Sequence, residues 1–254
     1  MHRTNPRSQR WTLVCAALVV VFAQAVFAAH PFITEDPGTL GTGRIELELG
    51  LAARQGDPSV NGRENAFSPQ FSLGITPTID LIAQTIWLNQ MPARSPTLVG
   101  NGDTIADFKW RFFETDAVAF AVRAGLDLPT GDSTTGLGAG ALGYHAIAVA
   151  GVRLGSYAVY ANAAYAYTRQ PATRANLGLF SVALTRPDDA PLRTFVEMAT
   201  FTNVDPGNPQ SPAVARTGLI YTVNALLDVD AGFQARLNRS ATRAVWLAGA
   251  TLRW

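Results

Sequence analysis

Apolar and polar residues alternate at every second position along most of the chain beyond residue 43. The segment 118–128 is a clear example. Phe120 and Val122 fall on one of its faces, and Arg123 and Asp127 fall on the other. A period of two is typical of a β-strand, because successive side chains of a strand point to opposite sides. The pattern therefore predicts strands that are apolar on one face and polar on the other.

About twelve such segments follow one another, separated by Gly, Pro, Asn and Asp. Their lengths fit strands that cross a hydrocarbon layer at a tilt, which takes about 9–11 residues each. A closed barrel pairs every backbone group within lipid, and an even strand number is typical of bacterial outer-membrane barrels. We expect an all-β transmembrane antiparallel up-and-down β-barrel of about 12 strands, at 43–55, 64–75, 79–89, 103–114, 117–128, 142–154, 157–168, 175–185, 192–203, 213–223, 227–237 and 243–254.

The connections between these segments alternate between long and short. Outer-membrane barrels have short periplasmic turns and longer extracellular loops, so the alternation places both termini of the barrel in the periplasm. The segment 186–191 is long for a turn. The predicted long set is 56–63, 90–102, 129–141, 169–174, 204–212 and 238–242, and the short set is 76–78, 115–116, 155–156, 186–191 and 224–226.

Residues 1–28 have the pattern of a secretory signal peptide. An apolar run at 11–27 ends before a plausible cleavage point, with the small residues Val26 and Ala28 at the −3 and −1 positions. The alternative is an uncleaved anchor, but a spanning helix needs about 20 apolar residues. The positive start of this segment consists of Arg3, Arg7 and Arg10.

Cleavage leaves an arm at 29–42 and the barrel at 43–254. The sole cysteine, Cys15, lies in the signal peptide, so the mature chain has no disulfide framework. Removing three arginines from the 20 basic residues leaves 17 against 19 acidic residues, a net charge of −2. This balance gives no basic patch for nucleic acid.

The last strand ends on an aromatic residue, Trp254. Apolar residues occupy every second position before it: Leu252, Ala250, Ala248 and Trp246. This pattern resembles the signal that the outer-membrane assembly machinery reads. We therefore predict that Trp246, Leu252 and Trp254 form an assembly signal, and that the protein resides among the lipids of the bacterial outer membrane.

Several motifs resemble those of a family of outer-membrane transporters associated with the meta pathway of phenol degradation. The resemblance extends over nearly the whole mature chain and implies an outer-membrane barrel that passes small hydrophobic or aromatic compounds. It carries over no catalytic residue and does not define one solute. The matching segments are His30–Gly43, Arg44–Gly50, Gly102–Thr104 with Lys109–Phe112, and Leu126–Asp132 with Gly136–Gly140.

Enzymatic chemistry has little support in the sequence. An embedded hydrolase needs a serine close to a histidine base. The mature chain has two histidines, His30 and His145, and neither neighbours a recognisable serine-hydrolase motif. We expect His145 to lie inside the barrel or at its rim, and we do not expect an enzyme.

We also expect no metal and no cofactor. Two histidines without cysteine cannot make the usual nitrogen and sulfur sites. Asp228 and Asp230 share one face and could suggest calcium, but we expect Arg236 and other inward arginines to neutralise them. Gly136–Gly140 lacks the Lys-Ser/Thr of a phosphate loop, so we interpret it as a flexible extracellular loop.

Charged residues of the strands must face inwards, because an arginine facing lipid costs about 2–4 kcal/mol at mid-bilayer. They either pair across a narrow lumen and stabilise the barrel, or line a small aqueous path. The arm at 30–42 either enters the lumen as a partial plug or stays a short free arm. The predicted inward set is Glu46, Glu48, Arg54, Asp107, Lys109, Arg111, Arg123, Asp127, Arg193, Glu197, Asp228, Asp230, Gln234, Arg236 and Arg253.

The sequence therefore favours a channel or transporter for small solutes, including hydrophobic or aromatic compounds. The alternative is a structural or surface-interaction barrel without flux, and an embedded lipid-modifying enzyme is the least favoured class.

Overall fold

The computed structural model describes residues 30–57, 61–169, 173–186 and 190–254. The predicted signal peptide, residues 1–28, lies outside the described residues. Within these ranges the regular structure consists of β-strands, and no helix is long and apolar enough to cross a membrane.

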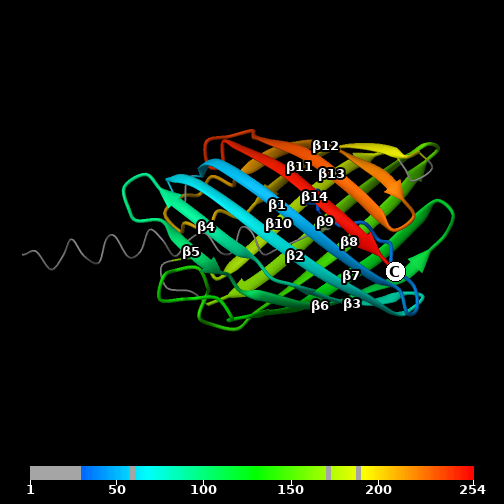
Figure 1. The fold of residues 1–254 in the computed structure, drawn as a ribbon, viewed down its shortest axis with the longest axis horizontal. Coiled ribbons are helices and arrows are strands. Elements are labelled where there is room, and N and C mark those ends of the chain that lie inside the picture. Colours follow the sequence, from blue (N-terminus) through cyan, green and yellow to red (C-terminus); the bar gives the residue numbers. More distant parts are fainter. Residues whose placement is uncertain (1–29, 58–60, 170–172, 187–189) are drawn as a thin grey trace, which may run out of the picture.

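In the described ranges, fourteen strand segments form one antiparallel sheet that closes on itself. β1 pairs with β2 on one side and with β14 on the other, which removes the free edges of the wall (Figure 1). The segments are β1 (Ile45–Asp57), β2 (Gly62–Thr76), β3 (Ile79–Gln84), β4 (Trp87–Pro92), β5 (Leu98–Asn101), β6 (Thr104–Glu114), β7 (Val118–Leu128), β8 (Gly143–Leu154), β9 (Tyr157–Thr168), β10 (Asn176–Thr185), β11 (Leu192–Phe201), β12 (Ala213–Asn224), β13 (Leu227–Arg236) and β14 (Ala244–Arg253).

Two of the barrel strands are interrupted. β3 and β4 pair with consecutive parts of β2, so they are the two halves of one strand. β5 pairs with β4 and β6 pairs with β3, so these segments are the two halves of the next strand. The described segments therefore make a closed barrel of twelve antiparallel strands, as the sequence predicted.

Pro69 accounts for the first interruption. It lies in β2 between Phe67, which pairs with Trp87, and Gln70, which pairs with Gln84. Proline has no N–H to donate to a sheet ladder, so pairing lapses opposite it. One hydrogen bond remains there, from the Thr85 N–H to the Pro69 carbonyl at 3.1 Å.

One predicted connection is wrong. We expected 90–102 to be a long loop, but β4 continues to Pro92 and β5 begins at Leu98, so the loop is only 93–97. Hydrogen bonds between β4 and β5 continue into residues whose apolar and polar side chains no longer alternate clearly. The sequence pattern therefore did not reveal this hairpin. The remaining connections keep their order, with longer loops at one end of the barrel, here called the long-loop end, and short turns at the other.

The two faces of the wall differ in chemistry. On β7, Phe120 and Leu126 are exposed on the outside, whereas Arg123 and Asp127 are buried inside. Exposed aromatic and aliphatic side chains cover the outer surface throughout the described strands. In lipid, such a surface is the stable arrangement, because only apolar groups are buried there without partners. The fold is that of an outer-membrane β-barrel, and its buried charged side chains lie on the inner face.

Candidate functional site

The arm, residues 30–42, runs through the lumen. Its contacts reach inward side chains of strands on different sides of the barrel, among them Glu48 on β1, Lys109 on β6 and Glu197 on β11. Pro31 and Pro37 interrupt the run, and prolines disfavour regular pairing with a sheet. The arm is therefore held by side chains of the wall and does not add a strand to it.

Glu35 lies at the centre of these contacts. Its carboxylate accepts hydrogen bonds from Lys109 Nζ at 2.6 Å and from Arg123 Nη1 at 2.8 Å, and all three side chains are buried. Burial alone would raise the pKa of Glu35, but the charges of Lys109 and Arg123 outweigh it and lower the pKa from 4.5 to about 2. The carboxylate is therefore ionised and joins β6 and β7 to the arm.

Arg123 connects this contact to the wall. Its Nε donates to Asp107 at 2.7 Å, and its Nη2 donates to Gln70 at 3.2 Å. His145 lies between two carboxylates, with Nε2 3.0 Å from Asp107 and Nδ1 3.2 Å from Asp127. Both ring nitrogens of His145 face acids, which leaves neither of them for a serine hydroxyl.

Glu197 holds the preceding part of the arm. Its carboxylate accepts from the main-chain N–H groups of Ile33 and Thr34, at 2.8 and 3.0 Å, and from the Thr34 hydroxyl at 3.0 Å. Arg216 lies 3.5 Å from the same carboxylate and donates to the Pro31 carbonyl at 2.7 Å. A buried carboxylate with several donors is strongly stabilised. This arrangement fixes the arm backbone, and not only its side chains.

Apolar contacts support the same part of the arm. The rings of Phe32 and Phe195 lie 4.0 Å apart between centroids. Ile33 is buried in an inner cluster with Leu179 and Val214. The arm thus combines an acid, an aromatic ring and an aliphatic side chain within four residues, each with its own partner on the wall.

Both ends of the arm are also attached. The His30 N–H donates to Glu48 at 3.0 Å, and the His30 ring nitrogen Nδ1 lies 2.8 Å from Asp230. At the short-turn end, the Leu40 N–H donates to Asp80 at 3.0 Å. The attachment therefore extends over the whole described arm.

A second group of charges lies near the short-turn end. Arg253 donates to Glu46 at 2.7 Å and to Asp228 at 2.7 Å, and Arg193 also pairs with Asp228. We expected Arg236 and other inward arginines to neutralise Asp228 and Asp230; Arg193 and Arg253 do pair with Asp228, but among the described residues no ion pair joins Arg236 to either aspartate. Arg236 ends β13 with an exposed side chain, because its inward position is already at the rim of the barrel.

The predicted inward residues are therefore distributed over several contacts. The half-buried members are Glu46, Arg54, Arg111, Arg193 and Arg253, and Arg111 lies 3.2 Å from Glu114 at the end of β6. Arg236 is exposed. The buried members are Glu48, Asp107, Lys109, Arg123, Asp127, Glu197, Asp228, Asp230 and Gln234.

Sequence reasoning missed Glu35 and Gln70, which complete the central contact. Gln70 lies on the polar face of the predicted strand 64–75, so the alternation that placed Gln234 inside could have placed Gln70 there as well. Glu35 lay in a segment without periodicity, although an acid in an arm that precedes a barrel with inward cations was the available clue. Among the described residues, no group of three or more His, Cys, Asp or Glu side chains is arranged to hold a metal ion.

The loop between β7 and β8 folds back against the inner wall. Asp103 accepts hydrogen bonds from the Gly131 N–H at 2.9 Å and the Ala139 N–H at 2.7 Å. Leu137 is buried against Ile86 and Leu88. We expected Gly136–Gly140 to be a flexible loop, but its carboxylate anchor and its buried leucine attach it at the long-loop end.

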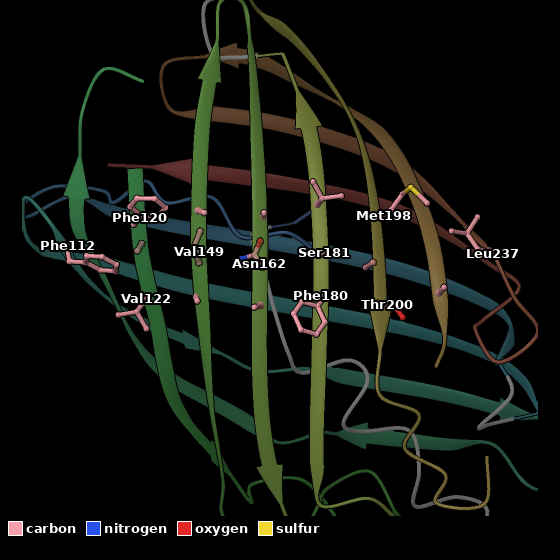
Figure 2. Close-up of a pocket in the computed structure, with 18 residues that line it drawn as sticks. Phe112, Phe120, Val122, Val149, Asn162, Phe180, Ser181, Met198, Thr200 and Leu237 are labelled. Atoms are coloured by element: carbon pink, nitrogen blue, oxygen red, sulfur yellow. The ribbon is translucent and has the colours of Figure 1, made fainter. Parts of the chain in front are cut away.

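A hollow of about 880 Å³ lies on the wall formed by β7 to β12. Figure 2 shows this wall in front, with the opposite side of the barrel behind it. Its exposed members include Phe180 and Met198, and its floor contains the alanine pair Ala148 and Ala163, which are in register. Since these residues are on the outward, apolar face, the hollow belongs to the membrane-facing surface and not to the lumen.

Together, the closed wall, the apolar exterior and the charged interior define a protein of the outer-membrane β-barrel class. No protein-family model and no curated protein sequence matches this chain.

Solved structures resemble it at the level of the fold. An outer-membrane channel from Pseudomonas putida F1 matches with a TM-score of 0.69 at 11% identity, covering 86% of this chain and 98% of that chain. The NanC porin matches with a TM-score of 0.61 at 8% identity, covering 81% and 98%. The KdgM porin in complex with oligogalacturonate matches with a TM-score of 0.55 at 9% identity, covering 82% and 98%.

Proposed function

We propose that the protein is an outer-membrane channel for small solutes, with hydrophobic and aromatic compounds as the candidate class, and that the arm is the plug of this channel. The observation that carries the proposal is the arm in the lumen, attached by Glu35 and Glu197. A barrel that needs only stability gains little from a separate segment with charges of its own. A lumen that must open and close needs a removable element.

The comparisons support the same choice. The solved barrels of this fold that are reported above are a channel and two porins. The resemblance of His30–Gly43 and other segments to transporters associated with the meta pathway of phenol degradation supports aromatic solutes. A structural barrel without flux is the alternative, and an embedded enzyme is not favoured, because His145 faces two carboxylates.

The C-terminal strand supports the proposed location. Trp246 is on the outward face of β14 and Trp254 directly follows this strand, and their side chains are 57% and 59% exposed. Leu252 occupies the same alternate positions. We propose that these three residues are read by the outer-membrane assembly machinery before the barrel closes.

Conductance of the refolded mature chain in a planar bilayer tests the channel. Pro37 on the arm packs against Gly151 of β8, so a Pro37→Cys/Gly151→Cys pair places two thiols side by side. We expect the oxidised pair to be silent and the reduced pair to show current steps that phenols or aromatic acids alter. The wild-type chain under both redox conditions is the control.

A barrel that remains silent under every condition, although correctly folded, would count against the channel and favour the structural alternative. Equal currents before and after reduction, with the disulfide confirmed by mass spectrometry, would count against the plug alone.

A further inference from the structure

The contact of Glu35 with the wall has the composition of a ligand site. Lys109 and Arg123 present two cationic groups to one carboxylate, at 2.6 and 2.8 Å, from adjacent strands β6 and β7. A carboxylate between a lysine and an arginine forms strong, charge-assisted hydrogen bonds. The carboxylate here belongs to the arm, which is covalently tethered but is not part of the wall.

The wall beside this cation pair is apolar. Ile147 on β8 is the register partner of Arg123, and it is 1% exposed. With Ala121 and Val149, it forms an inner apolar cluster. The inner surface therefore has an apolar cluster directly beside the cation pair.

We propose that Lys109 and Arg123 form a binding site for small monocarboxylates with an apolar body, such as aromatic acids, and that Glu35 occupies this site as an internal mimic until a solute displaces it. The inference rests on the proposed channel function. The charge balance supports it, because Arg123 has a second acid, Asp107, at 2.7 Å. Among the described residues, the acid nearest to Lys109 besides Glu35 is Asp36, at 3.9 Å, and the register partner of Lys109, Asp80, accepts a hydrogen bond from the Leu40 N–H of the arm. Without the charge of Glu35, the two cations Lys109 and Arg123 lack the carboxylate that they share.

A tethered group competes with free ligand at an effective concentration in the millimolar range or above. Wild-type protein should therefore bind a free carboxylate poorly, and Glu35→Ala should bind it better. The probe is benzoate, titrated by calorimetry into full-length mature protein in detergent. Benzamide, an uncharged analogue of similar size, is the control ligand. Asp116→Asn, which neutralises an exposed carboxylate in the turn 115–117, is the control variant.

We expect Glu35→Ala to bind benzoate about tenfold more tightly than wild type, or better. Asp116→Asn should behave like wild type, benzamide should show no such difference, and Glu35→Ala/Lys109→Met should lose the gain. If Glu35→Ala does not form a barrel that resists SDS without heating, Glu35→Gln takes its place in the same comparison. Equal benzoate binding by wild type and variant, or benzamide binding as tight as benzoate binding, would overturn the site.

Conductance measured on the same preparations separates this inference from the channel. If Glu35→Ala conducts but gains no benzoate affinity, the carboxylate site is wrong and the channel stands. If it binds benzoate with the expected gain but never conducts, the site stands and the channel is wrong.

Discussion

Replacing Glu35 with glutamine should weaken the docking of the arm in the lumen. The substitution keeps the size of the side chain but removes the charge that Lys109 and Arg123 share. Both cations are buried, so water cannot replace the lost partner. Loss of one member of a buried ion pair is strongly destabilising, because it leaves an uncompensated charge.

The magnitude follows from the pKa of Glu35. A lowering from 4.5 to about 2 means that the folded protein favours the ionised form. Since one pKa unit is about 1.4 kcal/mol, the charge contributes about 3 kcal/mol to the docked state. The ratio of docked to undocked arm should fall by about two orders of magnitude.

Labelling of a single cysteine measures this ratio. Pro37 is buried in the docked arm, and the predicted mature chain contains no other cysteine. A Pro37→Cys reporter should react slowly with a maleimide, and about a hundredfold faster when Glu35→Gln is added, if labelling follows the undocked fraction. Asp116→Asn is the matched control and should leave the rate unchanged. Equal rates with and without Glu35→Gln, in barrels that are equally resistant to SDS, would refute the reasoning.

Three further results are expected. Because the pKa of Glu35 is lowered, its contribution to arm docking is complete above about pH 4.5 and is lost as the pH falls towards about 2; the labelling rate of the reporter divided by its rate in Glu35→Gln at the same pH, which cancels the pH dependence of the thiol itself, should rise towards one over that range. Gly125→Ala should destabilise the barrel by about 1–3 kcal/mol in urea titrations, because its Cβ would collide with the Asp107 carboxylate and the main-chain carbonyl of Ala106. Gly178→Ala, whose Cβ would find its nearest atom at 3.4 Å, should be close to neutral and would expose a flaw in the steric argument if it were not. Trp254→Ala should lower the amount of folded protein in outer-membrane fractions, whereas refolding in detergent stays normal, and unchanged membrane levels would argue against the assembly signal.

Local chemistry explains why the strands were predictable. Alternation at period two depends only on the pleat of a strand and on which side faces lipid. It therefore placed segments such as 117–128 and 157–168 to within a residue of β7 and β9. The interrupted strands were harder to predict. Pro69 of β2 interrupts the hydrogen-bond ladder between β2 and the segments β3 and β4, and the alternation weakens opposite it.

The inner face of each strand was also predictable, but its partners were not. The sequence by itself determined that Lys109, Arg123 and Asp107 point inwards, because charge is excluded from the lipid side. Which acid meets which base depends on the stagger of the strands and on the closure of β1 against β14, and neither is encoded in a single segment.

Only the tertiary structure decided the role of the arm's side chains. Glu35 is separated by 74 residues from Lys109 and by 88 from Arg123, and no local pattern relates them. The barrel has to close before the arm can lie inside it, next to Lys109 and Arg123. Glu35 of the arm then supplies the carboxylate that pairs with both cations. Periodicity determines faces because it is local, whereas the lumen contacts arise from closure, which involves the whole chain.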